Sequence, residues 1–502
     1  MPKAFVAVDL GAESGRVVAI TLDENSKNST LKCFSIHEAH RFPTNSVRLP
    51  SGLHWDIVGI WREIVSGLVL VAGWANENDH EVCSIGVDTW GVDWSLIDGN
   101  GELLGLPHAY RDPRNNPAYE QVTAQIPIAE IYQITGIQLM PINSLYSLFA
   151  LSSHSPDLVA AADRLLFIPD LLHYFLSGVA TNEQTIASTS QLLDIRSGTW
   201  SEKLLDVCEV SRDLFSEPIP PGSVVGNIRK QVSRETGLNK QVQVVAPPSH
   251  DTASAVAAIP ADSKSNWCFI SSGTWSLVGA ELDEPCLSAA AEAAMFTNEA
   301  GVSGTTRFLK NISGLWLIQQ CRRAFASRGQ TYSYDEITDI ANMAEPFRTL
   351  IDPDDEPFAA PGKMLDKISQ FAQKSDQPAP ETPGDYLRCC LESLALAYSD
   401  TIDTLQSVLD KQFDVVHIVG GGGKNKLLNQ MTADACELPV VVGPFEATAI
   451  GNGLVQAMAL GEIKDLNELR NIVTQTIEPE RFEPQESEGW SAAKQRFRKL
   501  RG

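Results

Sequence analysis

Two segments of this sequence could each bind a phosphate group. The apolar run Phe5–Leu10 precedes Gly11–Arg16, and about 260 residues later Trp267–Ile270 precedes Ser271–Thr274. Each segment predicts a β-hairpin, because a second apolar run follows a short turn with glycine and hydroxyl side chains. Such a turn lets backbone N–H groups approach an anion that a bulkier loop would hold away. The repeat indicates two related domains that hold a polyphosphate from opposite sides, which favours a nucleotide-dependent enzyme.

Asp9 stands at the end of the first predicted strand, directly before the glycine-containing turn. A carboxylate in that position can hold Mg²⁺ and its waters beside bound phosphates. The alternative is a strand-end aspartate that forms an Asx-turn. Arg16 could add a positive charge to the same anion site, or it could lie in solvent at the strand edge. We predict a metal site at Asp9.

The junction Ser249–Thr252 could supply a base. It follows the predicted strand Val242–Ala246 and begins a helix of small residues. Asp251 could orient a substrate hydroxyl and accept its proton, or Ser249 or Asp251 could be an ordinary N-cap. A helix N-terminus favours the ionised carboxylate, so we expect a weak base. Phosphoryl transfer tolerates a weak base, because positioning matters more than proton abstraction in its loose transition state. The residues alone leave both interpretations open.

Gly420–Gly423 lies between a predicted strand and a predicted helix. It matches neither the P-loop spacing nor the dinucleotide-binding fingerprint, which disfavours a nicotinamide dehydrogenase. The segment could offer bare backbone to a base or ribose, or it could be a tight structural turn. The small residues of Gly443–Gly453 favour close helix packing over a further nucleotide contact.

Asp88–Trp94 predicts a tight hairpin that carries aromatic and acidic side chains. Ring faces beside carboxylates suit a sugar, although tryptophan in a strand is more often part of the core. The polar cluster His108–Arg114 could line the same cleft or could be a surface loop.

Composition limits the class of protein. A chain of 502 residues predicts two domains. Its 39 basic and 63 acidic residues give a net charge of −24, which disfavours nucleic acid or an anionic lipid surface as a partner. Nine scattered cysteines predict reduced thiols in a cytoplasmic protein. The sequence enters a predicted strand without a signal-peptide pattern, and the apolar stretch Leu68–Ala75 is too short to span a membrane.

The succession of strands and helices predicts an α/β fold in both halves. Predicted strands cover residues 5–10, 17–22, 31–36, 82–88, 92–97, 242–246, 267–270, 275–278, 415–419 and 440–442. Predicted helices cover 57–72, much of 115–215 (with helical spacing over 126–137 and 165–176), 386–409, 425–436 and 446–460. The proline-rich stretch 352–383 predicts loops.

Together these motifs resemble the FGGY carbohydrate kinases, over nearly the whole chain to about residue 480. The resemblance is carried by Asp9–Arg16, Asp88–Asp93, Tyr110–Arg114, Ser249–Ala255, Ser271–Ser276, Leu309–Ile312 and Val419–Gly423. It implies two duplicated actin-like (ribonuclease H-like) domains with mixed sheets flanked by helices, and an interdomain cleft. The implied boundaries are 1–247 for an N-terminal, sugar-binding domain, 248–480 for a C-terminal, ATP-binding domain and 481–502 for a tail.

The resemblance also implies a reaction: transfer of the γ-phosphoryl group of ATP to the 1-hydroxyl of L-rhamnulose, with Mg²⁺ as cofactor. One alternative is a kinase for another ketose, such as xylulose or fuculose. Another is a non-catalytic, actin-like ATP-binding assembly protein. Either a monomer or a small homo-oligomer is compatible with the resemblance.

By position in these motifs, Asp251 corresponds to the proton acceptor. The implied sugar contacts are Gly91, His250, Asp251, Thr252 and Asn311. The implied ATP contacts are Ala12, Glu13, Ser14, Gly15, Arg16, Thr274, Gln319 and Gly421. Some relatives have serine in place of Glu13, so we expect the backbone of Glu13, rather than its carboxylate, to serve the phosphates.

Overall fold

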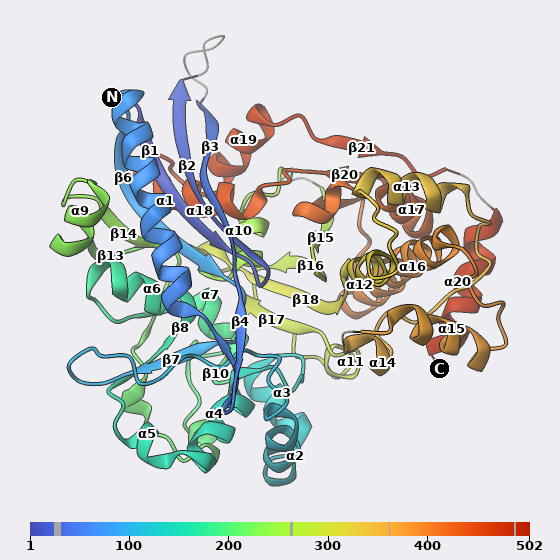
Figure 1. The fold of residues 1–502 in the computed structure, drawn as a ribbon, viewed down its shortest axis with the longest axis horizontal. Coiled ribbons are helices and arrows are strands. Elements are labelled where there is room, and N and C mark those ends of the chain that lie inside the picture. Colours follow the sequence, from blue (N-terminus) through green and yellow to red (C-terminus); the bar gives the residue numbers. More distant parts are fainter. Residues whose placement is uncertain (25–31, 262–264, 361, 486–487, 502) are drawn as a thin grey trace. The chain divides into compact units, whose positions relative to one another are not determined.

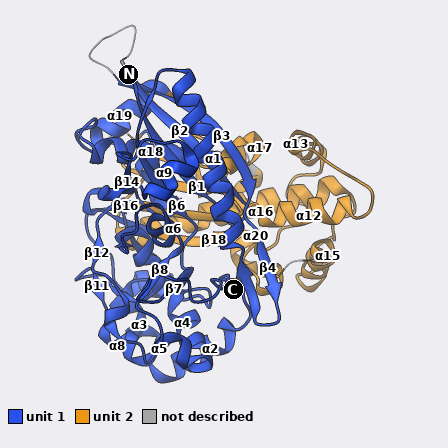
Figure 2. Cartoon of the chain, turned by 60° about the vertical axis from the view of Figure 1, so that its left-hand side comes forward, with its two compact units in different colours: residues 1–260, 281–308, 447–476 blue, residues 261–280, 309–446, 477–502 orange. Residues whose placement is uncertain are grey.

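A computed structural model describes residues 1–24, 32–261, 265–360, 362–485 and 488–501 (Figure 1). The chain divides into two compact units (Figure 2). Unit 1 comprises residues 1–260, 281–308 and 447–476, and unit 2 comprises residues 261–280, 309–446 and 477–502. Both units contain a mixed sheet with helices, so the α/β prediction is confirmed. The boundaries predicted after residues 247 and 480 stay predictions.

A six-stranded mixed sheet, in the order β13-β14-β6-β1-β2-β3, forms the centre of unit 1. Its strands are β1 Lys3–Leu10, β2 Ser14–Glu24, β3 Lys32–Pro43, β6 Glu81–Thr89, β13 Ser223–Asn227 and β14 Gln243–Ala246. β1 pairs antiparallel with β2, so the first predicted hairpin is confirmed. It also pairs parallel with β6. β3 was predicted to start at residue 31, which lies outside the described residues.

Helices cover both faces of this sheet. They are α1 Ile57–Glu77, α6 Ile168–Ser177, α9 Lys230–Thr236, α10 Asp251–Ala257, α18 Ala447–Ala459 and α19 Leu466–Thr476. On one face, Val6 belongs to an apolar core with residues of α1, α6 and α9. On the other face, Gly453 of α18 packs against Ile20, whose partner in β1 is Phe5. Because Phe5 and Val6 are neighbours in a strand, these two layers lie on opposite sides.

Much of the rest of unit 1 encloses a second apolar core. Its helices are α2 Asn115–Gln125, α3 Ile128–Thr135, α4 Ser144–His154, α5 Pro156–Ala160, α7 Gln184–Ala187 and α8 Glu202–Val207, with the short turns η1 Ser188–Ser190 and η2 Arg212–Leu214. Its paired strands are β7 Trp94–Ile97 with β8 Arg164–Phe167, β9 Asn182–Glu183 with β12 Pro218–Ile219, and β10 Leu193–Asp194 with β11 Thr199–Trp200. Unit 1 also contains β4 Ser46–Leu49 paired with β5 Gly52–Trp55, α11 Ala289–Ala293, β17 Thr297–Ala300 and η3 Val302–Gly304.

Two expectations for unit 1 are wrong. The strands on either side of Thr89–Gly91 do not form a hairpin, because β6 pairs with β1 and β14 whereas β7 pairs with β8. The stretch 165–176 is not one helix, because its first residues form β8 before α6 begins. In both cases a long-range strand pairing overrides the local pattern.

Unit 2 contains a β-hairpin like the one at the start of unit 1. β15 Trp267–Ser272 pairs antiparallel with β16 Trp275–Leu282, which confirms the second predicted hairpin. β15 also pairs parallel with β19 Val415–Val419, and β19 pairs parallel with β20 Val440–Val442. β18 Thr306–Ser313 lies next to β16 in the same sheet, and β21 Glu480–Phe482 lies at the edge next to β20.

The helices of unit 2 include five that the sequence did not predict: α12, α13, α14, α15 and α20. The helices of this unit are α12 Trp316–Ala326, α13 Tyr334–Met343, α14 Glu356–Ala359, α15 Met364–Lys374, α16 Pro383–Leu409, α17 Lys426–Cys436 and α20 Glu488–Arg501, with the turn η4 Gly421–Lys424. The predicted long helix is confirmed as α16, which begins with a capping box at Thr382. The expectation of loops over 352–383 is wrong for the short helix α14 and for α15, where Met364, Leu365 and Ile368 form a buried apolar face.

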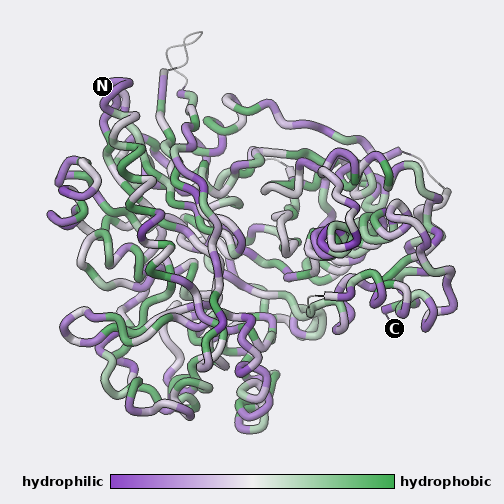
Figure 3. Tube along the Cα trace, in the orientation of Figure 1, coloured by the Kyte–Doolittle hydropathy of each residue, from purple (hydrophilic) through white to green (hydrophobic). Residues whose placement is uncertain are grey.

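Helix α1 is long and apolar enough, by length and composition, to be a candidate membrane span. Its hydrophobic residues extend along most of its length (Figure 3). The stretch Leu68–Ala75 therefore belongs to a longer apolar helix than we expected. The face that includes Ile60, Ile64 and Leu68 is buried in the first core of unit 1, which accounts for part of this apolar character.

Close contact between α10 and α18 confirms that the small residues after Gly443 serve helix packing. A Cβ atom on Gly451 would stand 1.8 Å from the Ser254 carbonyl oxygen, so the two helices touch through backbone. This contact fixes the position of α10, whose first residue is Asp251.

Replacing Gly451 with alanine should force the two helices apart and lower the free energy of unfolding of unit 1 by about 1–3 kcal/mol. Urea midpoints followed by tryptophan fluorescence would measure this loss. Gly73→Ala in α1 is the matched control, since its Cβ would meet nothing within 4 Å and alanine favours a helix by up to about 1 kcal/mol. Equal losses in the two variants would contradict the packing account.

Candidate active site

Three carboxylates gather where the strands of unit 1 end. Asp9, near the end of β1, lies opposite Asp88 of β6 in the parallel ladder. The backbone N–H of Thr89, at the end of β6, donates to the Ser249 carbonyl at 2.9 Å, which places the start of α10 and Asp251 beside them. Residues 79 and 163 positions apart in sequence thus meet at the carboxyl edge of one sheet, as ligand-binding residues commonly do in open α/β sheets.

The Asp9 carboxylate is paired with Arg16 across the first hairpin. Arg16 Nε and Nη2 donate to Asp9 Oδ2 at 2.9 and 2.6 Å. Both side chains are largely buried, with 10% of Asp9 and 14% of Arg16 exposed. The turn between them is closed by the backbone, where Gly11 N–H donates to the Ser14 carbonyl at 2.9 Å. Arg16 therefore brings its positive charge to the strand end rather than to solvent.

Asp88 lies behind Asp9 and is fully buried. Burial raises its pKa well above the usual range, and the negative charge of Asp9 adds to that effect. Asn452 Nδ2 donates to its Oδ2, whereas its Oδ1 has no hydrogen-bond partner among the described residues. Of the three clustered carboxyl groups, that of Asp88 therefore resists ionisation.

Asp251 is not an N-cap. His250 occupies the N-cap position of α10, and Asp251 is the first helical residue. Ser249 Oγ donates to the Pro247 carbonyl at 3.0 Å, so Ser249 does not cap the helix either. The Asp251 side chain keeps 32% of its area exposed and accepts a hydrogen bond from Thr252 Oγ1 at 3.0 Å.

The Asp251 carboxyl is a stronger base than the helix N-terminus alone predicts. Burial and the charge of Asp9 raise its pKa, while His250 opposes the shift. A raised pKa brings a carboxylate closer to the range in which it can accept a proton.

Glu299 and Arg307 lie behind His250 and were missed by the sequence reasoning. Arg307 is fully buried, and its Nη1 lies 2.9 Å from Glu299 Oε2 and 3.1 Å from His250 Nδ1. No short-range pattern joins them to His250. A buried arginine in the apolar strand β18 was the available signal, because such a charge requires a partner.

The aromatic segment after β6 is organised by one buried carboxylate. Asp93 Oδ2 accepts hydrogen bonds from the indole N–H groups of Trp55 and Trp90, at 2.6 and 2.8 Å, and from the backbone of Tyr110 at 3.2 Å. The two indole rings lie 4.1 Å apart. Gly91, between Trp90 and Asp93, is close-packed, since a Cβ there would stand 3.2 Å from Thr189 Oγ1. Asp93 therefore orients rings and is itself inaccessible to a sugar.

Two of the predicted ATP-binding residues, Thr274 and Gln319, lie next to each other in unit 2. Gln319 of α12 lies with its Nε2 3.5 Å from Thr274 Oγ1 in the turn of the second hairpin. The backbone N–H of Leu315, at the start of α12, donates a hydrogen bond to the Gly273 carbonyl in this turn at 2.9 Å. Asn311 lies in β18, in the same unit.

The glycine segment after β19 packs on the second hairpin. Gly420 has φ +87°, and a Cβ there would stand 2.8 Å from the Ser272 carbonyl oxygen. A Cβ on Gly422 would stand 2.1 Å from Ser272 Oγ, whereas one on Gly421 would meet nothing within 4 Å. The segment is thus a tight turn against Ser272 that leaves one glycine uncovered.

Unit 1 holds Asp9, Ala12–Arg16, Gly91 and His250–Thr252 of the predicted site, and unit 2 holds Thr274, Asn311, Gln319 and Gly421. The predicted cleft that would join these two sets stays a prediction.

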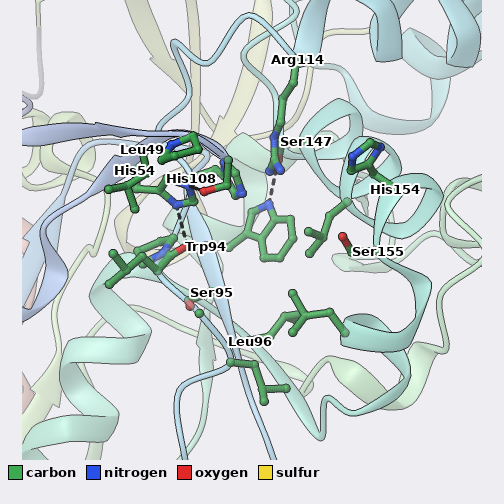
Figure 4. Close-up of a pocket in the computed structure, with 18 residues that line it drawn as sticks. Leu49, His54, Trp94, Ser95, Leu96, His108, Arg114, Ser147, His154 and Ser155 are labelled. Carbon is green, nitrogen blue, oxygen red and sulfur yellow. Dashed lines mark hydrogen bonds between the residues drawn. The ribbon is translucent and has the colours of Figure 1, made fainter.

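A cavity of about 460 Å³ in unit 1 is lined by residues of β7 and α4, with His108 and Arg114 (Figure 4). Trp94 lies in its wall and donates from Nε1 to Ser147 Oγ at 2.9 Å. None of the predicted site residues is among the described residues that line it. His108 and Arg114, from the predicted polar cluster, therefore face this cavity.

Replacing Asp93 with asparagine should make stability less sensitive to pH. Burial raises the pKa of Asp93 to about 7, against an ordinary value of 3.8. Above about pH 4 the unfolded state loses this proton while the folded state keeps it until about pH 7. Asp93 therefore lowers the free energy of unfolding by about 1.4 kcal/mol per pH unit over that range. Asparagine resembles the protonated acid and lacks this dependence.

The difference in unfolding free energy between Asp93→Asn and the parent, measured with urea, should therefore rise from about pH 4 to 7 and then level off. Asp98→Asn is the control, because backbone hydrogen bonds lower the pKa of the Asp98 carboxyl, so its effect on stability lies below about pH 4 and its difference should stay flat from about pH 4 to 7. A flat difference for Asp93→Asn would show that the carboxylate is ionised at little cost.

Comparison with known proteins shows the family of the chain. The model of the FGGY family of carbohydrate kinases, N-terminal domain, matches residues 4–258, and the C-terminal domain model matches residues 268–460. A rhamnulokinase of Bacteroides thetaiotaomicron is 42% identical over 98% of both chains. A rhamnulokinase of Pectobacterium atrosepticum is 40% identical over 99% of this chain and 96% of its own.

Solved structures show the same fold at low identity. A xylulose kinase of Lactobacillus acidophilus superposes with a TM-score of 0.80 at 15% identity, covering 99% of this chain and 97% of its own. A gluconate kinase of the same organism gives 0.79 at 16% identity, covering 100% and 97%. With both domain models matched and relatives aligned along nearly its full length, the chain belongs to the FGGY family of carbohydrate kinases.

Proposed function

We propose that this protein transfers the γ-phosphoryl group of ATP to the 1-hydroxyl of L-rhamnulose, giving L-rhamnulose 1-phosphate and ADP. The observation that carries this proposal is the near full-length identity of 40–42% to relatives named rhamnulokinase. The site geometry supports a kinase reaction, because a partly exposed aspartate with a raised pKa stands beside the end of a phosphate-type hairpin.

In the proposed mechanism, Asp251 orients the sugar hydroxyl and accepts its proton as the phosphoryl group transfers. His250, Thr252, Gly91 and Asn311 would contact the sugar. The carboxylate needs to act only late, because little proton abstraction is required before the phosphorus–oxygen bond forms in a loose transition state. Positioning of the hydroxyl would supply most of the rate enhancement.

ATP would be bound by backbone of both hairpins. In unit 1 the proposed contacts are Ala12, Glu13, Ser14, Gly15 and Arg16. In unit 2 they are Thr274, Gln319 and Gly421, where the bare glycine surface suits a flat ligand. Glu13 is exposed at the turn, so its backbone is within reach of a phosphate.

Mg²⁺ is the proposed cofactor, held at Asp9. The described residues contain no group of three or more His, Cys, Asp or Glu side chains that could cage a metal. A magnesium ion that accompanies ATP usually needs only one or two carboxylates, with waters and phosphates as its other ligands. Asp9, with the unpartnered oxygen of Asp88 behind it, fits that requirement. Bound there, the ion would neutralise developing charge on the phosphates.

We further propose that the enzyme works in the cytoplasm on these small molecules, without nucleic acid or membrane as a partner. Its net charge of −24 repels both kinds of polyanionic surface. A monomer and a small homo-oligomer are both compatible with this proposal.

ADP release measured across a panel of ketoses tests the substrate. L-rhamnulose should give the highest kcat/KM, and ³¹P and ¹³C NMR should place the phosphate on its 1-hydroxyl. A higher kcat/KM with xylulose or fuculose would move the assignment to another ketose. ATP turnover that is independent of any sugar, with sedimenting filaments, would favour the assembly protein.

Replacing Asp251 with asparagine should lower kcat by about 10²–10⁴ and leave the KM for ATP nearly unchanged, because the amide cannot accept the proton. Steady-state kinetics with L-rhamnulose would measure both. Asp98→Asn, in an exposed loop, is the control and should keep normal turnover. Near-normal turnover in Asp251→Asn would remove the proposed role.

A further inference from the structure

The side chain of His250 is held from behind by a buried pair of opposite charges. His250 Nδ1 lies 3.1 Å from Arg307 Nη1 and 3.1 Å from Glu299 Oε2. Arg307 also donates from Nε to the Ala300 carbonyl at 3.0 Å, which fixes the guanidinium in place. At most 9% of any of these three side chains is exposed. Water therefore has little access to Nδ1.

Arginine can only donate hydrogen bonds, because its guanidinium has five N–H groups and no acceptor. The hydrogen bond between Arg307 and His250 consequently requires a lone pair on Nδ1. A neutral imidazole has one such lone pair, and its proton is then on Nε2.

We infer that Arg307 occupies the only lone pair of His250, so that His250 is a hydrogen-bond donor and Asp251 is the sole base at this junction. Arg307 and Glu299 are positioning residues in this scheme, since they act through His250. The catalytic consequence rests on the proposed function, whereas the protonation state of the ring does not.

The other ring nitrogen faces Asp251. His250 Nε2 lies 3.4 Å from Asp251 Oδ1, close enough for a proton on Nε2 to point toward the carboxylate. Such contacts are often long without substrate and shorten when it binds. A proton on Nε2 favours the ionised form of Asp251 and leaves the imidazole without a lone pair for a sugar hydroxyl. The two neighbouring groups, which could both be bases in principle, thus have different tasks.

Glu299 allows one alternative, in which Nδ1 carries a proton and donates it to Glu299 Oε2. Arg307 opposes this arrangement in two ways. Its Nη1 already pairs with the same oxygen at 2.9 Å, and an Nδ1–H would face an arginine N–H at 3.1 Å. Burial alone would raise the pKa of Glu299, but the charges of Arg307 and His250 outweigh burial and lower it, which favours an ionised Glu299 beside Arg307.

Other elements around His250 add negative charge or acceptors. From β9, Glu183 Oε2 accepts from the Ser249 backbone at 3.2 Å. From α7, Thr185 Oγ1 accepts from the His250 backbone at 3.2 Å. Among these groups Arg307 is the positive charge that faces Nδ1. Removing Arg307 should therefore allow the ring proton to lie on Nδ1, where Glu299 Oε2 can accept it.

The ¹⁵N shifts of the histidine ring nitrogens test this directly in the full-length protein. The His250 signals, assigned by their loss in His250→Asn, should show a protonated Nε2 and an unprotonated Nδ1 near neutral pH. In Arg307→Met, Nδ1 should become protonated and pair with Glu299, and in Arg307→Lys the parent pattern should persist at least in part. A parent ring protonated at Nδ1 would overturn the inference, whether or not the variants fold.

Kinetics test the catalytic consequence. Arg307→Met should lower kcat on the order of 10²-fold, as expected when a catalytic group is misplaced, with the KM for ATP unchanged. Arg307→Lys should restore part of the loss. The matched control is Arg388→Met in unit 2, which breaks a similar pair to the buried Glu392 at 2.7 Å and should leave kcat unchanged.

The pH profile separates positioning from a merely structural role. In the parent, kcat should fall toward acid pH through one group, Asp251, whose pKa burial raises above its usual range. In Arg307→Met the acid side of the profile should change, because His250 is no longer held as a donor toward Asp251. An unchanged profile in a folded Arg307→Met would contradict the positioning role. If the parent phosphorylates no ketose at all, the proposed function fails, while the ring shifts still decide the protonation state.

Discussion

The repulsion between clustered carboxylates is the constraint on which the rest of unit 1 depends. Sheet register places Asp9 next to Asp88, and the junction before α10 brings Asp251 to them. Charges at such short range repel strongly in a medium of low polarity. Two features reduce this repulsion. Arg16 pairs with Asp9, and the carboxyl groups of Asp88 and Asp251 have raised pKa values and so resist ionisation. A site arranged in this way attracts cations, and it is suited to a nucleotide that arrives with a metal ion.

Both units contain the same kind of hairpin, with different surroundings. In unit 1 the hairpin turn lies beside the carboxyl groups of Asp9, Asp88 and Asp251. In unit 2 the turn of the second hairpin is hydrogen-bonded to the start of α12, and a glycine segment packs against Ser272. Side chains are absent at Gly420 and Gly422 because the backbone must approach Ser272 closely. Duplication followed by such specialisation accounts for one acidic and one glycine-rich site on similar sheets.

Local patterns predicted much of this fold, since both hairpins, α16 and the strands β15 and β19 follow from apolar runs and glycine turns. They did not predict that β7 pairs with β8, because that partner lies about 70 residues away and no turn residue points to it. Asp251 and Asp9 could be found because strand ends and helix starts carry sequence signals. Glu299 carried no such signal, and Arg307 carried only that of a charge in an apolar strand, because burial and long-range contact, rather than a motif, place them behind His250. Asp88 and Asp93 were expected to face a sugar, yet both are buried and hold other side chains in place.

The central claim is that Asp251 receives the proton of the sugar hydroxyl. The most direct measurement is a crystal structure of the protein with L-rhamnulose, magnesium and a non-hydrolysable ATP analogue. The account predicts that the 1-hydroxyl oxygen lies about 3 Å from an Asp251 oxygen and in line with the γ-phosphorus. A structure in which that hydroxyl contacts a ring nitrogen of His250, with Asp251 turned away from the sugar, would contradict it.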